Sequence, residues 1–575
     1  MNFDELKSQW PQLQTLSERP VAYFCAEFAL SDELPIYSGG LGILAGDVIR
    51  QANHWNFPLI GIGLLYKEGY FKQVISDAAT QDELPAYLNL PHALAPVRDA
   101  QGKVAQIKLP IANRIIHARI WQYTEGATRV LLLDTDVPEN SELDRRLTLN
   151  LYPTDSDWRI QQQIILGIGG VRALAELGIE PSVYHLNEGH SAFAIMEIAH
   201  QYMKRTQSLF SEGLAYACRR TVFTNHTLIP SGNDIFDRSI VARLISGYAD
   251  HLGLPIDEVM RMGAIPTNPA YFSMTHLALS ACFKASAVSK SHAQLAKTLW
   301  PDAQLIPITN GANRNFWQEE AWTNIDNKLQ RGLEVTDEEI WQIHRDLKRR
   351  LLRHILNTIN QQLNPDILTI TWARRIATYK QPLLLFSDIN RLVRITNDQT
   401  RPVQIILAGK AHPGDLSAKA MISEILKIIN QPGLAGRVVF LANYNLELAR
   451  LLVTGSDVWL NTPIKGQEAC GTSGMKAGLN GSLQCAISDG WTDEIDLPKL
   501  GFPIDPTNSA VDIYNVLEQK VGPLYYGRGA GNQVPADWIT MMRAIITQTS
   551  AHFTSERMMR EYITQLYLPT LQQPE

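Results

Sequence analysis

One lysine lies inside a loop of very small residues near the end of the chain. The segment from Glu468 to Gly481 reads EACGTSGMKAGLNG, and Lys476 stands there among glycine, serine and threonine. Glycine-rich loops present several backbone amides to one anion, often a phosphate. A lysine at such a place either neutralises the anion or reacts as an amine.

This loop does not match the phosphate loop of NTPases. That pattern needs a lysine directly after glycine and before serine or threonine, whereas Met475 precedes Lys476 and Ala477 follows it. A solvated surface lysine is the simplest alternative, since most lysines are exposed. The apolar neighbours favour a partly buried amine with a lowered pKa, which is a candidate for a Schiff base. With glycine amides and the Thr472 hydroxyl beside it, such an amine suits the phosphate of a pyridoxal cofactor.

A second group of cations follows an apolar run. The segment ARRIATYK places Arg374, Arg375 and Lys380 directly after ILTITW, and a solvated charge run is the alternative reading. Guanidinium forks and ammonium groups both suit phosphate. Two adjacent phosphates repel by about 4 kcal/mol per pair of unit charges at ~4 Å and an effective dielectric of ~20. A site that holds two phosphates therefore needs several fixed cations, and this chain has them.

The chain alternates short apolar runs with longer helical patterns, which predicts an α/β fold with parallel sheets. Polar clusters follow the predicted strands where ligands collect in such folds. These clusters are EGH after VYHL, NHT after TVF, ARR after ILTITW, GKAHPGD after VQIIL, and ANYN after RVVF. In the second half, helices are predicted over 337–356, 380–395, 419–431 and 446–455. A length of 575 residues favours two large domains, and the boundary is predicted near residues 308–317.

The segment SGGLGILAGD, residues 38–47, contains a weak dinucleotide fingerprint. It lacks a clear acidic partner at the expected distance, so we do not predict NAD. A tight turn is one alternative, and a helix N-terminus that approaches an anion is another.

The bulk composition excludes several classes. A net charge of -6 gives no sign of the basic surface that binds nucleic acid. No run of apolar residues approaches the length of a membrane span. The N-terminal segment has no apolar region typical of a signal peptide. The five cysteines form no CxxC pair, so we expect reduced thiols in the cytoplasm and no metal site.

Taken together, the motifs resemble the α-glucan phosphorylases, the family of glycogen, starch and maltodextrin phosphorylases. The resemblance covers most of the chain, from YFCAEF to the strand after the lysine loop, and EACGTSGMK is its most specific part. The other matching stretches are SGGLG, HLNEGHSA, TNHT, ITNG, RR-x-x-x-YK, GKAHPG and NYN.

The resemblance implies a GT-B fold, in which two Rossmann-like domains face each other across a catalytic cleft. It implies a glucan-binding domain over 1–315, a domain for pyridoxal 5'-phosphate (PLP) over 316–550, and a C-terminal helix over 551–575 that crosses back to the first domain. A homodimer is compatible with it.

The implied reaction is the reversible, retaining phosphorolysis of non-reducing-end α-1,4-linked glucose to α-D-glucose 1-phosphate. The substrates are glycogen or maltodextrin and orthophosphate, and the PLP phosphate is the proton donor and acceptor. No pair of carboxylates is then needed, unlike in ordinary glycosidases.

The resemblance also implies roles for single residues. The catalytic residues would be Lys476, Arg375, Lys380, His226 and Glu468. The cofactor would contact Lys476, Thr472, Gly471, Tyr444, Arg374 and Gly40. The substrate would contact Leu41, Glu188, Asn310, Tyr379, Ala469 and Cys470.

Several positions depart from the long members of the family. Ala377 and Thr378 stand where many long relatives have histidine and an acid, Glu188 replaces an aspartate, and Cys470 replaces a serine. The chain begins close to YFCAEF, so we expect the N-terminal regulatory sites of the long forms to be absent, as in short bacterial forms. Two alternatives stay open: a nucleotide-sugar transferase of the same fold, which needs no Schiff-base lysine, and a non-catalytic glucan-binding homologue.

Overall fold

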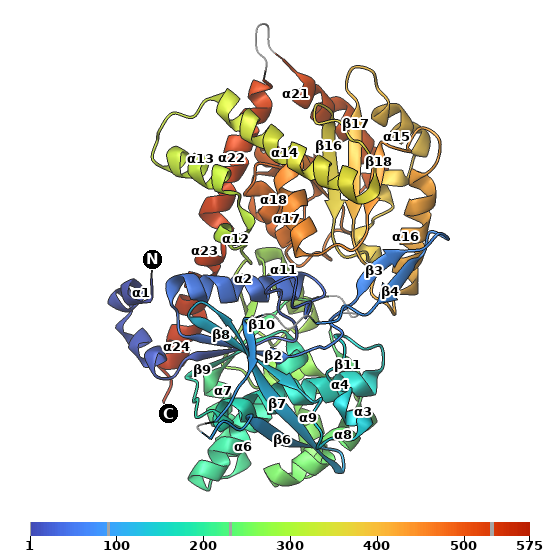
Figure 1. Ribbon diagram of the computed structural model, residues 1–575. Helices are drawn as coiled ribbons and strands as arrows, with labels where there is room; N and C mark the ends of the chain where they lie inside the picture. The colour runs from blue at the N-terminus through green and yellow to red at the C-terminus, as the bar shows by residue number, and fades with distance from the viewer. Residues whose placement is uncertain (1, 89–91, 100, 229–232, 529–533, 575) are drawn as a thin grey trace.

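The computed structural model describes residues 2–88, 92–99, 101–228, 233–528 and 534–574. Within these residues two large sheets, one in each half of the chain, are covered by helices (Figure 1). A hydrophobic core surrounds each sheet. The predicted α/β class with parallel sheets is therefore confirmed.

The sheet of the first half has ten described strands, and seven of them run parallel in the order β8-β2-β1-β9-β10-β14-β15. The remaining three, β7, β6 and β5, pair antiparallel at the β8 edge. The parallel strands are β1 (Val21–Phe24), β2 (Leu59–Leu64), β8 (Thr128–Asp134), β9 (Val183–Asn187), β10 (Thr221–Asn225), β14 (Lys284–Ala287) and β15 (Leu305–Pro307); the others are β5 (Leu94–Pro96), β6 (Gln106–Ile111) and β7 (Arg114–Glu125).

The sheet of the second half is parallel throughout, in the order β18-β17-β16-β19-β20-β21. The strands are β16 (Leu368–Ala373), β17 (Val403–Ala408), β18 (Val438–Leu441), β19 (Val458–Asn461), β20 (Leu483–Ile487) and β21 (Gly501–Ile504). In both sheets the strand order reverses once, at β1/β9 and at β16/β19. Ligands of doubly wound sheets bind at such reversals, outside the carboxyl ends of the strands.

The helices that matter for the site are α2 (Gly40–Trp55), α6 (Ala194–Thr206), α11 (Lys290–Leu299), α12 (Arg314–Trp317), α13 (Glu320–Gln330), α14 (Asp337–Ile359), α15 (Ile389–Thr396), α16 (Leu416–Ile429), α17 (Leu446–Gly455), α18 (Thr472–Gly478), α22 (Ala536–His552) and α23 (Ser555–Glu561). The predicted helix over 380–395 is wrong in its first half, where only short 3₁₀ turns form. Helix α15 begins after Asp388, whose side chain accepts a hydrogen bond from Arg391 N at 2.9 Å. Pro382 and this cap end any helix that would start at 380.

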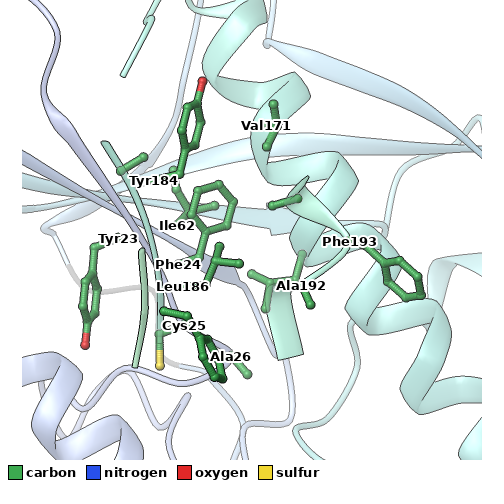
Figure 2. Close-up of a cluster of buried hydrophobic side chains, with 14 of the residues drawn as sticks. Tyr23, Phe24, Cys25, Ala26, Ile62, Val171, Tyr184, Leu186, Ala192 and Phe193 are labelled. Atoms are coloured by element: carbon green, nitrogen blue, oxygen red, sulfur yellow. The ribbon is translucent and has the colours of Figure 1, made fainter. Parts of the chain in front are cut away.

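Close packing around β1 joins the first sheet to its helices. Phe24 of β1 pairs with Ile62 of β2, and Figure 2 shows both near the helix that carries Val171, α5 (Gly170–Glu176). Gly170 is needed there, because a Cβ on it would lie 2.6 Å from the Phe24 ring. This packing fixes β1, whose carboxyl end leads into Cys25, Ala26 and Glu27.

Two segments cross between the halves. The hairpin of β3 (Lys72–Ile75) and β4 (Gln81–Leu84) reaches from the first half to α16 (Figure 1). Conversely, Met558 to Leu568 bury their apolar side chains in the core of the first half. No helix in the described ranges is long and apolar enough to span a membrane.

Candidate functional site

The lysine loop connects β19 to α18. Gly471, the N-cap of α18, has φ 85°, a left-handed value that favours glycine. Lys476 is the fifth residue of α18, and its Nζ returns to Thr472 Oγ1, one turn earlier, at 3.2 Å. The loop thus directs both side chains to the same place.

The Lys476 amine is buried, with 5% of the residue exposed. Its Nζ lies 4.4 Å from the centroid of the Trp317 ring. Burial lowers the pKa of Lys476 to about 8, while the charge of Asp47 opposes the shift. Trp317 Nε1 donates to both carboxylate oxygens of Asp47, at 2.9 and 3.0 Å. A fraction of the amine is therefore neutral near pH 7, as nucleophilic chemistry requires.

The predicted cations meet a carboxylate at the reversal of the second sheet. Lys380 Nζ donates to Glu468 Oε2 at 2.6 Å, and Arg374 Nη1 lies 3.5 Å from the same oxygen. Arg374 also donates to Asn461 at the end of β19. Burial raises the pKa of Glu468, but Lys380 and Arg374 outweigh it and hold this pKa below its usual value. The Nε of Arg374 is buried and has no hydrogen-bond partner in the described part of the protein.

Arg375 points to a different environment from Arg374. Its surface is accessible to solvent, yet residues of both halves surround it. This surrounding protein lowers the pKa of Arg375 by desolvation, but the hydrogen-bonded Tyr379, with Tyr70 and the carboxylate of Glu27, raises it overall. Tyr444 lies near Arg374, and burial raises its pKa to about 12. Arg375 is thus a cation with open access between the two halves.

The glycine segment of the first half begins α2. The amides of Ser38 and Gly39 donate to Glu27 Oε2 at 2.6 and 3.1 Å. The anion that these two amides bind is therefore the Glu27 carboxylate of the protein itself. Helix α2 starts at Gly40, and a Cβ built on Gly40 would meet no atom within 4 Å. Gly40 thus borders open space, whereas the neighbouring Leu41 is partly buried against the core of the first half.

Glu188 ends β9 with a backbone that carboxyl residues rarely adopt, φ 74° and ψ 166°. Its side chain accepts hydrogen bonds from the backbone of His226 at 2.8 Å and of Gly189 at 3.1 Å. Burial raises the pKa of Glu188 to about 7. His226 Nε2 donates to Asn187 Oδ1 at 2.6 Å, and burial lowers the pKa of His226 to about 3. This histidine is therefore neutral at physiological pH and is held in one orientation.

Residues after β14 and after β15 contact the loop before α18 and so join the halves. Ser289 Oγ donates to Ala469 O at 2.6 Å, and the Cys470 thiol hydrogen-bonds with the backbone of Asn310. Burial raises the pKa of Cys470, so the thiol is protonated. The side-chain oxygen of Asn310 is buried and has no partner among the described residues. Such an acceptor is suited to a hydroxyl that is not part of the protein.

Lys380 and Arg374 thus meet at Glu468, and Thr472 and Lys476 meet in α18, the helix that follows the same loop. Gly40, Leu41 and His226 make no hydrogen bond or ion pair to Lys476 within the described ranges. The described residues also contain no group of three or more metal-ligating side chains.

Sequence reasoning missed Glu27, Asn461, Trp317 and Asp47. Glu27 follows β1 and Asn461 ends β19, at the two sheet reversals, and that position would have found them. Asp47 gave no such signal, because Trp317 and Lys476, which reveal its role, lie in the other half.

Comparisons with known proteins agree with one another. Residues 319–497 match the model of the carbohydrate phosphorylase family. The chain is 38% identical to the maltodextrin phosphorylase of Thermococcus litoralis, over 96% of this chain and 71% of that protein. It is 35% identical to the glycogen phosphorylase of Mycobacterium tuberculosis, over 96% and 71%, and 33% identical to that of Aquifex aeolicus, over 97% and 87%.

Proposed function

The chain belongs to the carbohydrate phosphorylase family, and on that premise we propose that it is an α-1,4-glucan phosphorylase. It transfers the terminal glucose of glycogen or maltodextrin to orthophosphate and releases glucose 1-phosphate. The observation that carries the proposal is the buried Lys476 amine, which follows in the same loop the carboxylate of Glu468 that pairs with Lys380 and Arg374.

We propose a GT-B arrangement for the two sheets, with the domain limits 1–315, 316–550 and 551–575. Its support is that both sheets reverse their strand order beside the predicted site residues. Contacts between Ser289 and Ala469 and between Asp47 and Trp317 hold the two halves together there. Reduced cysteines support a cytoplasmic location. We also propose that the protein forms a homodimer.

The residues around Lys476 fit PLP. The amine is buried and partly neutral, Thr472 supplies a hydroxyl, and the Arg374 Nε lacks a partner in the described structure. Lys476 would anchor the cofactor, and Gly471, Thr472, Arg374, Tyr444 and Gly40 would contact it. When bound, PLP supplies a phosphate group whose ionisation near neutral pH suits acid–base chemistry.

The remaining cations would bind substrate orthophosphate. Arg375 offers a fork for two oxygens, and Lys380 a point charge. Their position between the halves raises the local concentration of the anion. Orthophosphate protonates the leaving glycosidic oxygen and then captures the sugar on the same face, which retains the anomeric configuration.

Polar groups of both halves would hold the reacting glucose. The neutral His226 and the unpartnered Asn310 oxygen can bond hydroxyls, and Glu468 accepts from a hydroxyl with its free lone pairs. Leu41, Glu188, Tyr379, Ala469 and Cys470 would line the same place. A sugar bound in this way is fixed relative to the phosphate, which lowers the entropic part of the barrier.

The test is release of glucose 1-phosphate from glycogen and maltodextrins with orthophosphate, for the wild type and Lys476→Ala. The wild type should release product and the variant should not, at equal folded content by circular dichroism. If a wild type that contains PLP releases none, the proposal fails. Glucosyl transfer from a nucleotide sugar would then favour a transferase, and binding of glycogen alone a non-catalytic homologue.

A further inference from the structure

A buried aspartate of the first half faces the reactive lysine of the second. Asp47 lies in α2 and is 1% exposed. Both of its carboxylate oxygens accept from Trp317 Nε1, and the Trp317 ring lies 4.4 Å from Lys476 Nζ. The indole therefore contacts the carboxylate through its N–H and the amine through its ring.

Asp47 and Lys476 share this cluster with Arg50 and Glu125. Arg50 Nη1 lies 3.6 Å from Asp47 Oδ1, and Arg50 Nε lies 3.8 Å from Glu125 Oε1, so Glu125 balances part of the charge of Arg50. Asp47 therefore remains available as a counter-charge for Lys476. Arg50 is fixed independently, because its Nη2 donates to the carbonyls of Ala29 and Leu30 and its guanidinium lies 3.8 Å over the Phe316 ring. Among the groups that act on Lys476, Asp47 has the largest charge effect, followed by Arg50 and the Cys470 thiol.

We propose that Asp47 is a positioning residue for Lys476: held by the Trp317 indole, it supplies the counter-charge that orients the amine. Asp47 and Arg50 belong to the first half and Lys476 to the second. The chemistry of the amine is thereby coupled to correct docking of the halves. The functional importance of this coupling rests on the proposed cofactor role of Lys476, whereas the experiment that detects the coupling is independent of that role.

The measurement is trace labelling of Lys476 with acetic anhydride between pH 6 and 10, in the full-length protein treated to remove bound carbonyl cofactor. Mass spectrometry of the peptide that contains Lys476 gives the labelling rate at each pH. We expect Asp47→Asn to move the midpoint of the profile down by about one pH unit, since an opposite charge is lost from a buried ammonium. At pH 7 the amine should then label about fivefold faster.

The direction in which the labelling midpoint moves distinguishes loss of the counter-charge from general disruption of the site. A variant that merely opened the site would expose the amine and move its midpoint up toward the ordinary lysine value. Asp47→Glu should restore most of the wild-type profile. Asp134→Asn, which removes another buried aspartate of the first half, paired with Arg119, should leave it unchanged.

Trp317→Phe tests the same idea if Asp47→Asn does not fold. It keeps a ring beside the amine but removes the donor that holds the carboxylate, so a smaller shift in the same direction is expected. An unchanged or raised midpoint in Asp47→Asn, or an unchanged one in Trp317→Phe, would overturn the proposal. Loss of glucan activity by itself would bear only on the proposed function.

Discussion

Lys380 Nζ and Glu468 Oε2 are joined by a 2.6 Å hydrogen bond in the buried part of the site. The same oxygen is 3.5 Å from Arg374 Nη1, so one carboxylate balances two cations. Removing one partner of a buried ion pair leaves the other uncompensated. The carboxylate therefore controls how much positive charge is offered to a phosphate.

Glu468→Gln should separate binding of phosphate from turnover. The variant adds one net positive charge to the site, so KM for orthophosphate should fall severalfold. At the same time kcat should fall by about tenfold or more, because an acceptor for the sugar is weakened. Initial rates at varied orthophosphate measure both constants. Asp493→Asn, which removes the partner of Lys465 at the surface, is the matched control, and a rise in KM would contradict the expectation.

Arg375 should depend on the shape of its side chain as well as on its charge. Arg375→Lys keeps the charge but loses the fork, so we expect KM for orthophosphate to rise about tenfold, and further in Arg375→Met. The same kinetic assay applies, with the exposed Arg353→Lys on α14 as control. Equal KM values for the lysine variant and the wild type would show that the fork is not used.

Glu188 should make the folded state less stable as pH rises. Its pKa is about 7 when folded and near 4.5 in an unfolded chain. The stability linked to its proton is fully present below pH 4.5 and is lost as pH rises through 7. Between pH 5 and pH 8 the wild type should therefore lose up to about 3 kcal/mol of unfolding free energy that Glu188→Gln does not lose.

Urea unfolding at the two pH values measures this difference. Glu180→Gln is the control, because ion pairing with Arg205 and Arg19 lowers the pKa of Glu180 and both pH values lie above it. If Glu188→Gln and the wild type respond equally to pH, the carboxyl is already ionised in the folded protein at pH 5.

Asp457 should matter for stability and not for catalysis. It accepts from Lys348 Nζ at 2.5 Å and from His344 at 2.6 Å, at the amino end of β19, away from the site. Burial raises the pKa of Asp457, but these two partners hold it below the usual value. Asp457→Asn leaves Lys348 buried without its counter-ion and should cost about 3–5 kcal/mol.

Unfolding free energy and activity per folded molecule, measured side by side, check this expectation. The double variant Lys348→Met with Asp457→Leu should recover part of the loss, since apolar replacement of both partners removes the stranded charge. A large loss of activity at unchanged stability would contradict the structural role.

The β3–β4 hairpin should fix how the halves dock. Gln73 Nε2 donates to Gly409 O at 2.9 Å, and Gln81 Nε2 donates to Ala411 O at 3.0 Å. These two buried amides hydrogen-bond to the backbone of the loop after β17 and hold it against the hairpin. Gln73→Ala with Gln81→Ala should speed hydrogen exchange in 72–84 and 409–411 by at least tenfold. The substitution Lys72→Ala, at an exposed position, is the control. If the double variant and the wild type exchange at equal rates, the hairpin does not determine how the halves dock.

The sequence predicted the parts of this protein that local patterns encode. Buried strands such as β16 (LTITWA) and β19 (VWLN) are short runs of apolar, β-branched and aromatic residues with polar residues at or just after their ends, so both the strands and the site residues there were predictable. The helix over 380–395 was predicted wrongly in its first half, because its apolar spacing concealed Pro382 and the cap at Asp388, whereas its second half forms α15. Asp47 could not be assigned, since a buried acid inside a helix is recognisable only when its partners in the other half are known.

The packing of Met558 to Leu568 against the first core also bears on biosynthesis. Most multidomain proteins complete their first domain while the ribosome is still making the next one. Here the core around β1 lacks part of its apolar cover until residues 558–568 have been made. The nascent chain therefore exposes that surface through most of translation, and the period in which it needs protection from aggregation lasts almost as long as its synthesis.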